Sequence, residues 1–479
     1  MTTPTDVLGR LAAGQERDLP VHGGTTLAYV YDSGLPEVDA VARQAVAAYA
    51  GSNGLDPSAF PSLVDLENDL VGFALDLVDG PDGAVGTVTS GGTESCLLAV
   101  LAARDARPEV PRPRMVVPST VHAAFHKAAH YFGVELVVVE VGEDFRADVA
   151  AMTAALDEAP ERTVLVVVSA PSYAHGVIDP VPAVAAAAAE RGIRCHVDAC
   201  IGGWVLPFAA RLGRPVAPWT FAVPGVTSIS MDSHKYGYAP KGTSLLLHRT
   251  AALRLPQFYA TANWPGYTVI NTTLQSTKSG GPLAGAWAVM QSLGAEGYLE
   301  LNRQVFAAVD ALVAGIDALP ELRILARPDS SLIAFSVADA AAGELDIFTL
   351  IDEVNLRGWH IQPQHAFGRT PANAHLSLSA ATLPHVPAFL EALAASVAAA
   401  RASGPVVVDP AMAEFVSSLD VSTLSEEEWN GILAAAGMGA GDGLPERMAP
   451  INALINLATP ATREAVVTSF IDQLSRPTR

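Results

Sequence analysis

The chain has 479 residues, of which 50% are hydrophobic, so it can bury a large core and is not a disordered protein. A formal net charge of -21 argues against nucleic acid as a partner, because binding to phosphate backbones needs clustered Lys and Arg. The three cysteines, Cys96, Cys195 and Cys200, form neither a disulfide framework nor a zinc pattern, which predicts a reducing compartment and no metal site.

The chain begins with MTTPTD, which lacks the basic and apolar regions of a secretory signal. No uninterrupted apolar run reaches the roughly 18 residues that a transmembrane helix needs. We therefore predict a cytoplasmic protein without a membrane span.

Short β-rich runs alternate with helical patterns in the middle of the chain. The expected strands are residues 86–88, 115–117, 135–139, 163–168, 195–197, 226–231 and 244–247. The expected helices are residues 96–104, 121–132, 146–156 and 181–191. This alternation predicts an α/β fold with a mostly parallel central sheet flanked by helices, and functional residues at the carboxyl ends of its strands.

The pattern changes after about residue 285. Two long helices are expected at 285–293 and 296–319, and Pro320 ends the second. A smaller α+β domain follows, with strands at 331–337, 359–362 and 375–379 and helices at 346–356 and 386–402. Residues 403–405 (SGP) break this pattern, residues 425–428 (SEEE) resemble a capping box that opens a helix, and residues 447–474 are mostly helical.

A glycine-rich segment, residues 89–95 (TSGGTES), lies between the first expected strand and its helix. Glycines let backbone N–H groups approach a phosphate, and a helix N-terminus favours its negative charge. A Gly-Gly pair before a helix is more often only a turn, so this segment alone indicates phosphate binding weakly.

Three further residues stand at strand ends. His122 could stack its imidazole on an aromatic cofactor, although a structural histidine is the commoner role. Asp198 ends a buried strand, where a carboxylate needs a partner such as a protonated pyridine nitrogen, unless it caps a helix. Lys235 follows another strand, and neighbouring His234 could steady a phosphate beside a Schiff-base lysine. The order of phosphate loop, His122, Asp198 and Lys235 indicates a pyridoxal 5'-phosphate site.

These residues resemble those of the pyridoxal phosphate-dependent group II decarboxylase superfamily, and most of all those of the sphingosine-1-phosphate lyases. The resemblance extends from about Tyr31 to the end of the small domain and more loosely to the C-terminus. The matching motifs are residues 89–95 (TSGGTES), 120–125 (TVHAAF), 175–181 (HGVIDPV), 196–203 (HVDACIGG) and 234–242 (HKYGYAPKG).

The resemblance implies a fold-type I enzyme and a homodimer with shared active sites. Its expected parts are an N-terminal segment at 1–60 that contributes to the dimer and the site entrance, a large cofactor-binding domain at 61–295, a small α+β domain at 296–403 and a C-terminal helical extension at 404–479.

The resemblance also implies how the cofactor is held. Lys235 would carry it as a Schiff base, His122 would stack on its ring, and Asp198 would bind the ring nitrogen, with the small residue Ala199 leaving room for the ring. The residues expected at the cofactor phosphate are Gly92, Thr93 and His234. Residues 276–281 (STKSGG) match a loop that reaches the cofactor phosphate of the neighbouring subunit, which would place Lys278 and Gly280 there.

A second group would act on the substrate. Tyr173 and Lys241 match residues that assist catalysis in the lyases, and Tyr31 matches a substrate-contacting tyrosine. Residues 53–57 (NGLDP) match a lyase segment, Asn-Pro-Leu-His-Pro, whose histidine holds the substrate phosphate, so Asn53 and Asp56 are expected near the substrate. Asp56 replaces that histidine, and a carboxylate repels a dianionic phosphate unless it faces away.

The expected function is carbon–carbon cleavage at Cα of an amine substrate, with an aldehyde as product. Decarboxylation of a small, non-phosphorylated amino acid remains the alternative, because the sequence does not fix which Cα bond breaks and because of Asp56. An aminotransferase or desulfurase on the same fold is disfavoured by residues 236–242 (YGYAPKG). A non-catalytic relative is disfavoured because Lys235, His122 and Asp198 are all retained.

Overall fold

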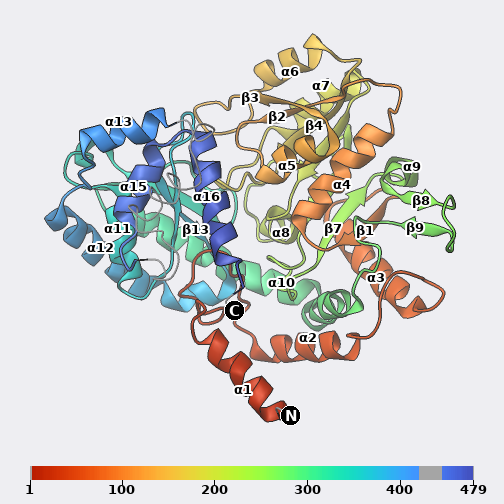
Figure 1. Cartoon of the computed structure of the whole chain (residues 1–479), viewed down its shortest axis with the longest axis horizontal. Helices are drawn as coiled ribbons and strands as arrows, with labels where there is room; N and C mark the ends of the chain where they lie inside the picture. Colours follow the sequence, from red (N-terminus) through yellow and green to blue (C-terminus); the bar gives the residue numbers. More distant parts are fainter. Residues whose placement is uncertain (1–2, 420–444, 478–479) are drawn as a thin grey trace. The chain divides into compact units, whose positions relative to one another are not determined.

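The computed structural model describes residues 3–419 and 445–477 (Figure 1). The chain separates into two compact units, which are treated one at a time below. Unit 1 consists of Met1–Asp310, Ala326–Ile333 and Ser377–Pro384, and unit 2 consists of Ala311–Leu325, Ala334–Leu376 and His385–Arg479. The finer division into four parts at residues 60, 295 and 403 stays a prediction.

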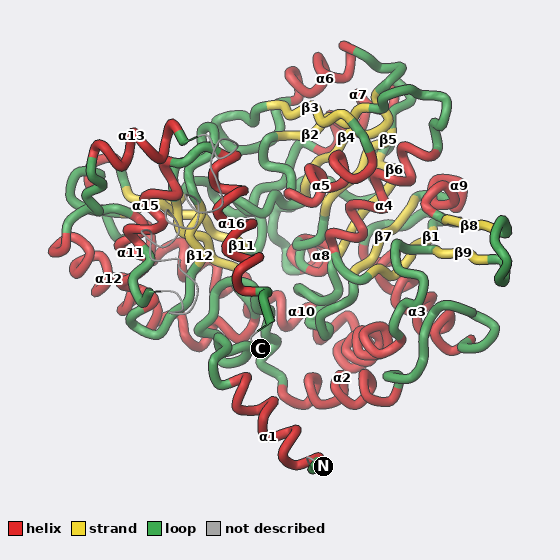
Figure 2. The backbone as a smooth tube through the Cα atoms, viewed as in Figure 1, coloured by secondary structure: helices red, strands yellow, loops and turns green. Residues whose placement is uncertain are grey.

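Unit 1 contains a seven-stranded sheet in the order β1-β7-β6-β5-β4-β2-β3 (Figure 2). Its strands are β1 (Val85–Thr89), β2 (Arg114–Pro118), β3 (Glu135–Val139), β4 (Thr163–Ser169), β5 (Arg194–Asp198), β6 (Val226–Met231) and β7 (Ser244–His248). Strand β7 runs antiparallel to both of its neighbours, and the other six run in one direction. The predicted, mostly parallel sheet is therefore confirmed.

Four crossover helices accompany this sheet. They are α4 (Gly92–Asp105), α5 (Ala123–Phe132), α6 (Val149–Glu158) and α7 (Val181–Glu190). Helices α4 and α5 pack on β2 and β4 through a core in which Val100, Phe125 and Met115 are fully buried. Three predicted starts were wrong. Helix α4 begins four residues earlier than expected, because Gly92 is already helical. His122 is the N-cap of α5, because its side chain accepts a hydrogen bond from Ala124 N. Helix α6 begins three residues later than expected, because Asp148 is its N-cap.

Unit 1 also contains elements that the sequence patterns did not predict. They are α1 (Pro4–Gln15), α2 (Pro36–Ala48), α3 (Pro61–Leu77), α8 (Leu206–Arg211), α9 (Ala251–Arg254) and a hairpin of β8 (Tyr259–Thr261) and β9 (Val269–Asn271). The first three helices each begin with proline, which fits the first helical position because its missing N–H has no intrahelical partner there.

Helix α10 (Gly280–Asp317) corresponds to the two long helices that were predicted. Gly294 has φ 54° and ψ -176°, which interrupts the helix where the sequence patterns place a break. Glycine suits this position because a left-handed φ is costly for other residues. The first of the two helices begins five residues earlier than predicted.

Unit 2 is built on a four-stranded sheet in the order β10-β11-β13-β12. Its elements are β10 (Leu322–Ile324), β11 (Leu332–Val337), α11 (Ile347–Asn355), β12 (Gln362–Gln364), β13 (Asn373–Ser377), α12 (Val386–Ser403), α13 (Pro410–Ser418), α15 (Ala449–Leu457) and α16 (Pro460–Leu474). The smaller α+β architecture is confirmed. The strand expected at 359–362 was misplaced, because Trp359 and Ile361 are apolar and buried without belonging to a strand.

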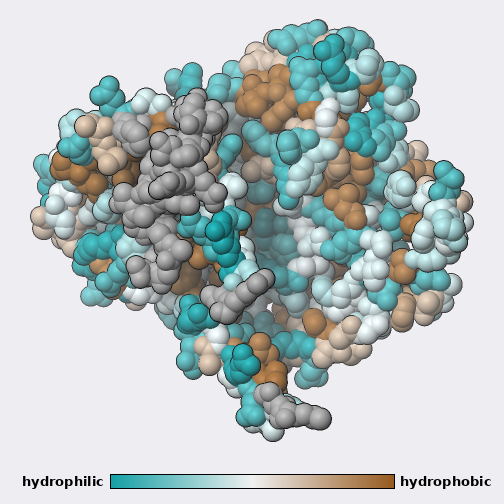
Figure 3. Space-filling view, in the orientation of Figure 1, coloured by the Kyte–Doolittle hydropathy of each residue, from teal (hydrophilic) through white to brown (hydrophobic). Residues whose placement is uncertain are grey.

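The C-terminal residues 447–474 are helical as predicted, and Asp352 of α11 accepts hydrogen bonds from the backbone of Met448 and Ala449 at the start of α15. The predicted capping box at 425–428 lies outside the described residues. Residues Ala380–Ser403 are long and apolar enough to cross a membrane by length and composition, a test that the core helix of a soluble protein also passes. Hydrophilic and hydrophobic side chains are mixed over the face drawn in Figure 3.

Candidate active site

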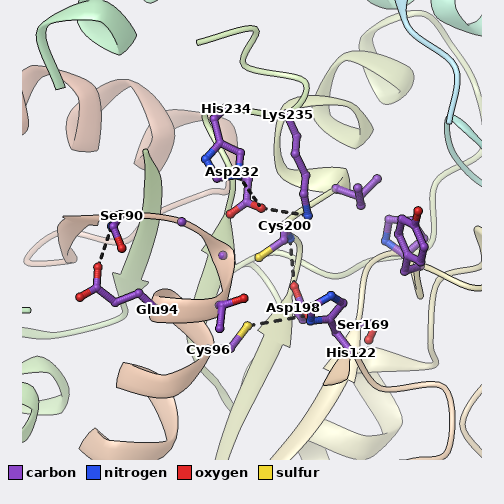
Figure 4. A pocket seen from close by; sticks show the side chains of 16 residues that line it. Ser90, Glu94, Cys96, His122, Ser169, Asp198, Cys200, Asp232, His234 and Lys235 are labelled. Carbon is purple, nitrogen blue, oxygen red and sulfur yellow. Dashed lines mark hydrogen bonds and ion pairs between the residues drawn. The ribbon is translucent and has the colours of Figure 1, made fainter. Parts of the chain in front are cut away.

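A cavity of about 390 Å³ lies at the carboxyl ends of the parallel strands of unit 1 (Figure 4). Parallel strands bring these ends to one edge of the sheet, so residues distant in sequence meet there. The predicted site residues that line the cavity are Gly92, Thr93, His122, Tyr173, Asp198, His234 and Lys235. Seven predicted residues are thus brought together by the topology.

Lys235 contacts a carboxylate to which the sequence analysis gave no role. Its Nζ lies 2.9 Å from Oδ2 of Asp232, which is 1% exposed (Figure 4). Burial favours the neutral amine, but Asp232, Tyr31 and Cys200 together outweigh burial and hold the pKa of Lys235 above its ordinary value. A buried carboxylate three residues before the lysine, directly after β6, was the signal that could have found Asp232.

His234 is a neutral imidazole on the same turn. Burial lowers its pKa to about 4, against the opposing effect of Asp232. Its Nδ1 accepts hydrogen bonds from the backbone of Gly242 and Thr243, at 3.4 and 3.3 Å. The proton of the neutral ring therefore lies on Nε2, which is 3.6 Å from Asp232.

Asp198 and His122 line the same cavity as Lys235 (Figure 4). Asp198 is 7% exposed, and its Oδ1 accepts hydrogen bonds from Cys200 N at 3.1 Å and from the Ser230 hydroxyl at 3.3 Å. Its Oδ2 is approached by the Cys96 thiol at 4.0 Å. This carboxylate is thus positioned by its protein donors and still lines the cavity.

Helix α4 points its N-terminus into the cavity. Its N-cap, Gly91, provides no side-chain hydrogen bond, so within the described part of the chain the N-cap leaves the first N–H groups of this 14-residue helix without a side-chain cap. A Cβ on Gly92 would lie 2.6 Å from Asp232, so only glycine fits. An uncapped helix N-terminus is a site for a phosphate.

These features fit pyridoxal 5'-phosphate. The cavity offers an amine for its aldehyde, a buried carboxylate for its ring nitrogen and a helix N-terminus for its phosphate. These three groups come from Lys235, Asp198 and the segment that contains Gly92 and Thr93, each at a different strand end.

Tyr31 and Lys241 lie beside this cavity but do not line it. Lys241 Nζ is 4.7 Å from the centre of the Tyr31 ring and donates to the His234 carbonyl at 3.1 Å. Burial, with Lys235 nearby, lowers the pKa of Lys241 to about 8. Tyr173 lines the cavity, and burial raises the pKa of its hydroxyl. Ala199 is fully buried next to Asp198.

The remaining predicted residues, Asn53, Asp56, Lys278 and Gly280, do not line this cavity. Lys278 lines a second cavity of about 340 Å³, where its Nζ lies 2.7 Å from Glu67 Oε2. Asn53 forms a β-bridge with Ser279, beside Lys278. Their predicted role across a dimer is not tested by one chain.

Gly280 and Asp56 have local partners as well. Gly280 N donates to Ser52 O at 2.8 Å, where a Cβ on Gly280 would come within 3.0 Å of that oxygen. Asp56 is exposed, and its Oδ1 accepts hydrogen bonds from the backbone and the hydroxyl of Ser58, at 2.8 and 2.6 Å. Its carboxylate therefore closes a local turn and does not face the cavity of its own chain.

Residues 28–338 match the pyridoxal-dependent decarboxylase conserved domain, and residues 410–473 match a C-terminal putative HTH domain of pyridoxal-dependent enzymes. The chain is 39% identical to a sphingosine-1-phosphate lyase of Arabidopsis thaliana over 76% of this chain and 66% of the relative. It is 31% identical to a probable L-tyrosine/L-aspartate decarboxylase of Methanothermobacter thermautotrophicus, over 67% of this chain and 85% of the relative.

The solved structure of a sphingosine-1-phosphate lyase from Burkholderia pseudomallei is also similar, with a TM-score of 0.78 and 33% identity over 88% of this chain and 96% of that one. The chain spans 66% of the Arabidopsis thaliana lyase and 61% of a lyase from Rattus norvegicus. The match of the conserved domain covers more than half of the chain and includes every residue that lines the first cavity. The chain therefore belongs to the pyridoxal-dependent decarboxylase family, as its strand-end motifs predicted.

Proposed function

We propose that the protein is a pyridoxal phosphate-dependent carbon–carbon lyase that cleaves a bond at Cα of an amine substrate and forms an aldehyde. The observation that carries this proposal is the position of Lys235 Nζ in one cavity with Asp198 and the uncapped N-terminus of α4. The identity of 39% to a sphingosine-1-phosphate lyase supports cleavage of the bond to a carbinol carbon.

Bound pyridoxal phosphate supplies an electron sink for the bond that breaks at Cα. The protein side chains supply position and charge. Lys235 offers the amine that binds the cofactor, and Asp198 keeps a positive charge favourable at the ring nitrogen. His122, at the N-cap of α5, lines the same cavity as Asp198 (Figure 4).

Three groups could move a proton near Cα. Lys235 lies in the cavity, Tyr173 lines it, and Lys241 lies beside it. A base is most effective when its pKa is near the working pH. Lys241, with a pKa lowered to about 8, meets that condition, whereas burial raises the pKa of Tyr173 and favours its protonated form. We propose Lys241 as the base and Tyr173 as a hydrogen-bond donor.

Decarboxylation of a small amino acid is the second candidate. It is supported by the relative from Methanothermobacter thermautotrophicus, because this chain spans 85% of that protein against 66% of the Arabidopsis thaliana lyase. The expected repulsion between Asp56 and a substrate phosphate does not support decarboxylation within one chain. The Asp56 carboxylate accepts hydrogen bonds from Ser58 and does not face the cavity.

We also propose a cytoplasmic homodimer with shared active sites. A dimer would give a role to Asn53, Lys278 and Gly280, which lie together and do not line the cavity of their own chain. Lys278 would then act as a cation toward the partner's cofactor phosphate, without the bidentate geometry of an arginine.

The function is tested by supplying the purified protein with pyridoxal phosphate and two substrate sets, long-chain amino-alcohol phosphates and amino acids. Aldehyde and carbon dioxide are measured separately. The proposal expects aldehyde from the first set, and Lys241→Arg should slow its formation while Lys127→Arg, a surface substitution, should not. Carbon dioxide from the second set without aldehyde from the first would establish the decarboxylase.

A further inference from the structure

A row of buried polar side chains continues from Asp198 into the centre of the sheet. His196 and Asp198 alternate on β5, and Ser228 and Ser230 alternate on the parallel neighbour β6. The register pairs His196 with Ser228 and Asp198 with Ser230. Because alternate residues of a strand share one face, all four side chains lie on the same face of the sheet.

Each member of this row is bonded to the next. His196 Nδ1 lies 2.8 Å from the Ser228 hydroxyl, and His196 Nε2 lies 3.2 Å from the Ser230 hydroxyl. The Ser230 hydroxyl donates to Asp198 Oδ1 at 3.3 Å. His196 and Ser230 are fully buried, and Ser228 is 5% exposed. A buried polar group without a partner is costly, so these bonds fix the side chains.

The ionised carboxylate of Asp198, at one end of the row, determines the direction of each hydrogen bond in the row. An ionised Asp198 can only accept, so the single proton of Ser230 points to Asp198. The Ser230 oxygen must then accept from His196, which places the imidazole proton on Nε2. His196 Nδ1 is left as an acceptor, so Ser228 donates to it.

We propose that Ser228, His196 and Ser230 are positioning residues that orient Asp198 and hold it ionised for the cofactor ring nitrogen. The inference rests on the proposed function, because it assigns Asp198 to that nitrogen. Two donors, Ser230 and the Cys200 backbone, occupy Oδ1 of Asp198. Among the described residues, the hydrogen bond to Oδ2 comes from the Cys96 thiol, at 4.0 Å, so Oδ2 remains the oxygen available to a ring N–H.

The surroundings of His196 favour the neutral ring that this row needs. Burial lowers the pKa of His196 to about 4, although Asp198 opposes the shift. The ring of Phe125 on α5 lies 5.7 Å from the imidazole, centre to centre. His248 on β7 also acts on this region, and burial lowers its pKa to about 3, so it adds no positive charge near neutral pH.

The first test asks whether the row acts through the ring nitrogen. Ser230→Ala and the native protein are loaded either with pyridoxal phosphate or with an analogue that has CH in place of the ring nitrogen. We expect Ser230→Ala to lower kcat about tenfold with pyridoxal phosphate and less than about twofold with the analogue, because the analogue has nothing for Asp198 to bind. The visible absorption of the bound cofactor should change with pH differently in Ser230→Ala and in the native protein.

Two further variants serve as a control and as a replacement in this test. Thr227→Val removes a β6 hydroxyl that bonds only the Cys195 carbonyl among the described residues, and it should leave kcat and the absorption spectrum unchanged. Ser228→Ala, at the far end of the row, replaces Ser230→Ala if that variant fails to fold, with the same direction and a smaller effect. An equal loss with both cofactors would overturn the proposal, because it would show a purely structural role.

The second test does not depend on the cofactor. Side-chain ¹⁵N NMR of the cofactor-free protein, assigned by the signal lost in His196→Phe, should show His196 neutral and protonated at Nε2 from about pH 6 to about pH 9. Protonation at Nδ1, or titration in this range, would overturn the proposed row. If the NMR result holds but Lys235 carries no cofactor, the proposed function fails and the row is structural.

Discussion

Two groups of predicted site residues behave differently in the structure. The first group, around Lys235, His122 and Asp198, meets in one cavity because each residue lies at or beyond the carboxyl end of a parallel strand of the same sheet. The second group, around Asn53 and Lys278, lies in segments that bond to each other and line another cavity. Topology alone explains the first group, whereas the second group would contact a cofactor only in the homodimer proposed above.

The largest effect is expected when the amine of the first group, on Lys235, is removed. Lys235→Ala should lower turnover by at least about 100-fold, because no other lysine among the described residues lines the cavity. The far-ultraviolet circular dichroism should be unchanged. Lys127→Ala, on the exposed side of α5, is the matched control and should keep native turnover. Native turnover in Lys235→Ala would refute the assignment.

The role of the second group is tested by mixing two variants of reduced turnover. Lys278→Ala should lose at least about tenfold in turnover if its charge contacts a phosphate. Mixing Lys235→Ala with Lys278→Ala should then restore about a quarter of native turnover, because half of the randomly formed dimers carry one site without a substitution.

The control for that experiment mixes Lys235→Ala with Asp198→Ala, two substitutions in the same cavity of one chain. Every site of these dimers contains a substitution, so no turnover should return. Restoration in the control, or none in the first mixture, would contradict active sites that are shared between subunits.

A smaller effect on kcat/KM is expected from a substitution of Lys241, which lies beside the first group. Its folded pKa of about 8 lies below its ordinary value of 10.5, so the neutral amine becomes available as the pH rises through about 8. If Lys241 is the base, kcat/KM should rise from about pH 7 to about pH 9. Lys241→Arg should abolish this rise, because a guanidinium stays protonated. A pH profile that keeps its rise in Lys241→Arg would assign the base elsewhere.

The smallest effect is expected at Asp56. Its carboxylate accepts hydrogen bonds from Ser58, so Asp56→His should weaken a surface turn and slightly lower the melting temperature. The kcat/KM for phosphorylated amino alcohols should change less than about twofold, as it should for the exposed control Asp65→His. A large gain specific to Asp56→His would show that this segment reaches a substrate across the dimer.

Much of the fold and half of the site could be predicted because strand periodicity and strand-end residues are local signals. Residues 226–231 were predicted as a strand with its observed bounds, and Lys235 follows from that strand. Asp232 was missed because a carboxylate near a lysine has many ordinary roles. The bonds between His196 and the serines of β6 were missed because they depend on the register of two strands, which periodicity does not fix.

Other features depend on contacts that no short pattern contains. The hairpin of β8 and β9 has only three residues in each strand, too few for a clear alternation. The position of Lys278 depends on its ion pair with Glu67, which is distant in sequence. The resemblance to a family identified Lys278 as a candidate site residue. It could not predict which residues Lys278 contacts within its own chain.

The central claim, that Lys235 holds pyridoxal phosphate, is tested most directly by borohydride reduction of the cofactor-loaded protein followed by peptide mass analysis. The chain has four lysines, Lys127, Lys235, Lys241 and Lys278, so the modified residue can be assigned without ambiguity. We predict one pyridoxyl group per chain, on the peptide that contains Lys235, and its absence in Lys235→Ala. An unmodified Lys235, or a pyridoxyl group on another lysine in the native protein, would contradict the account.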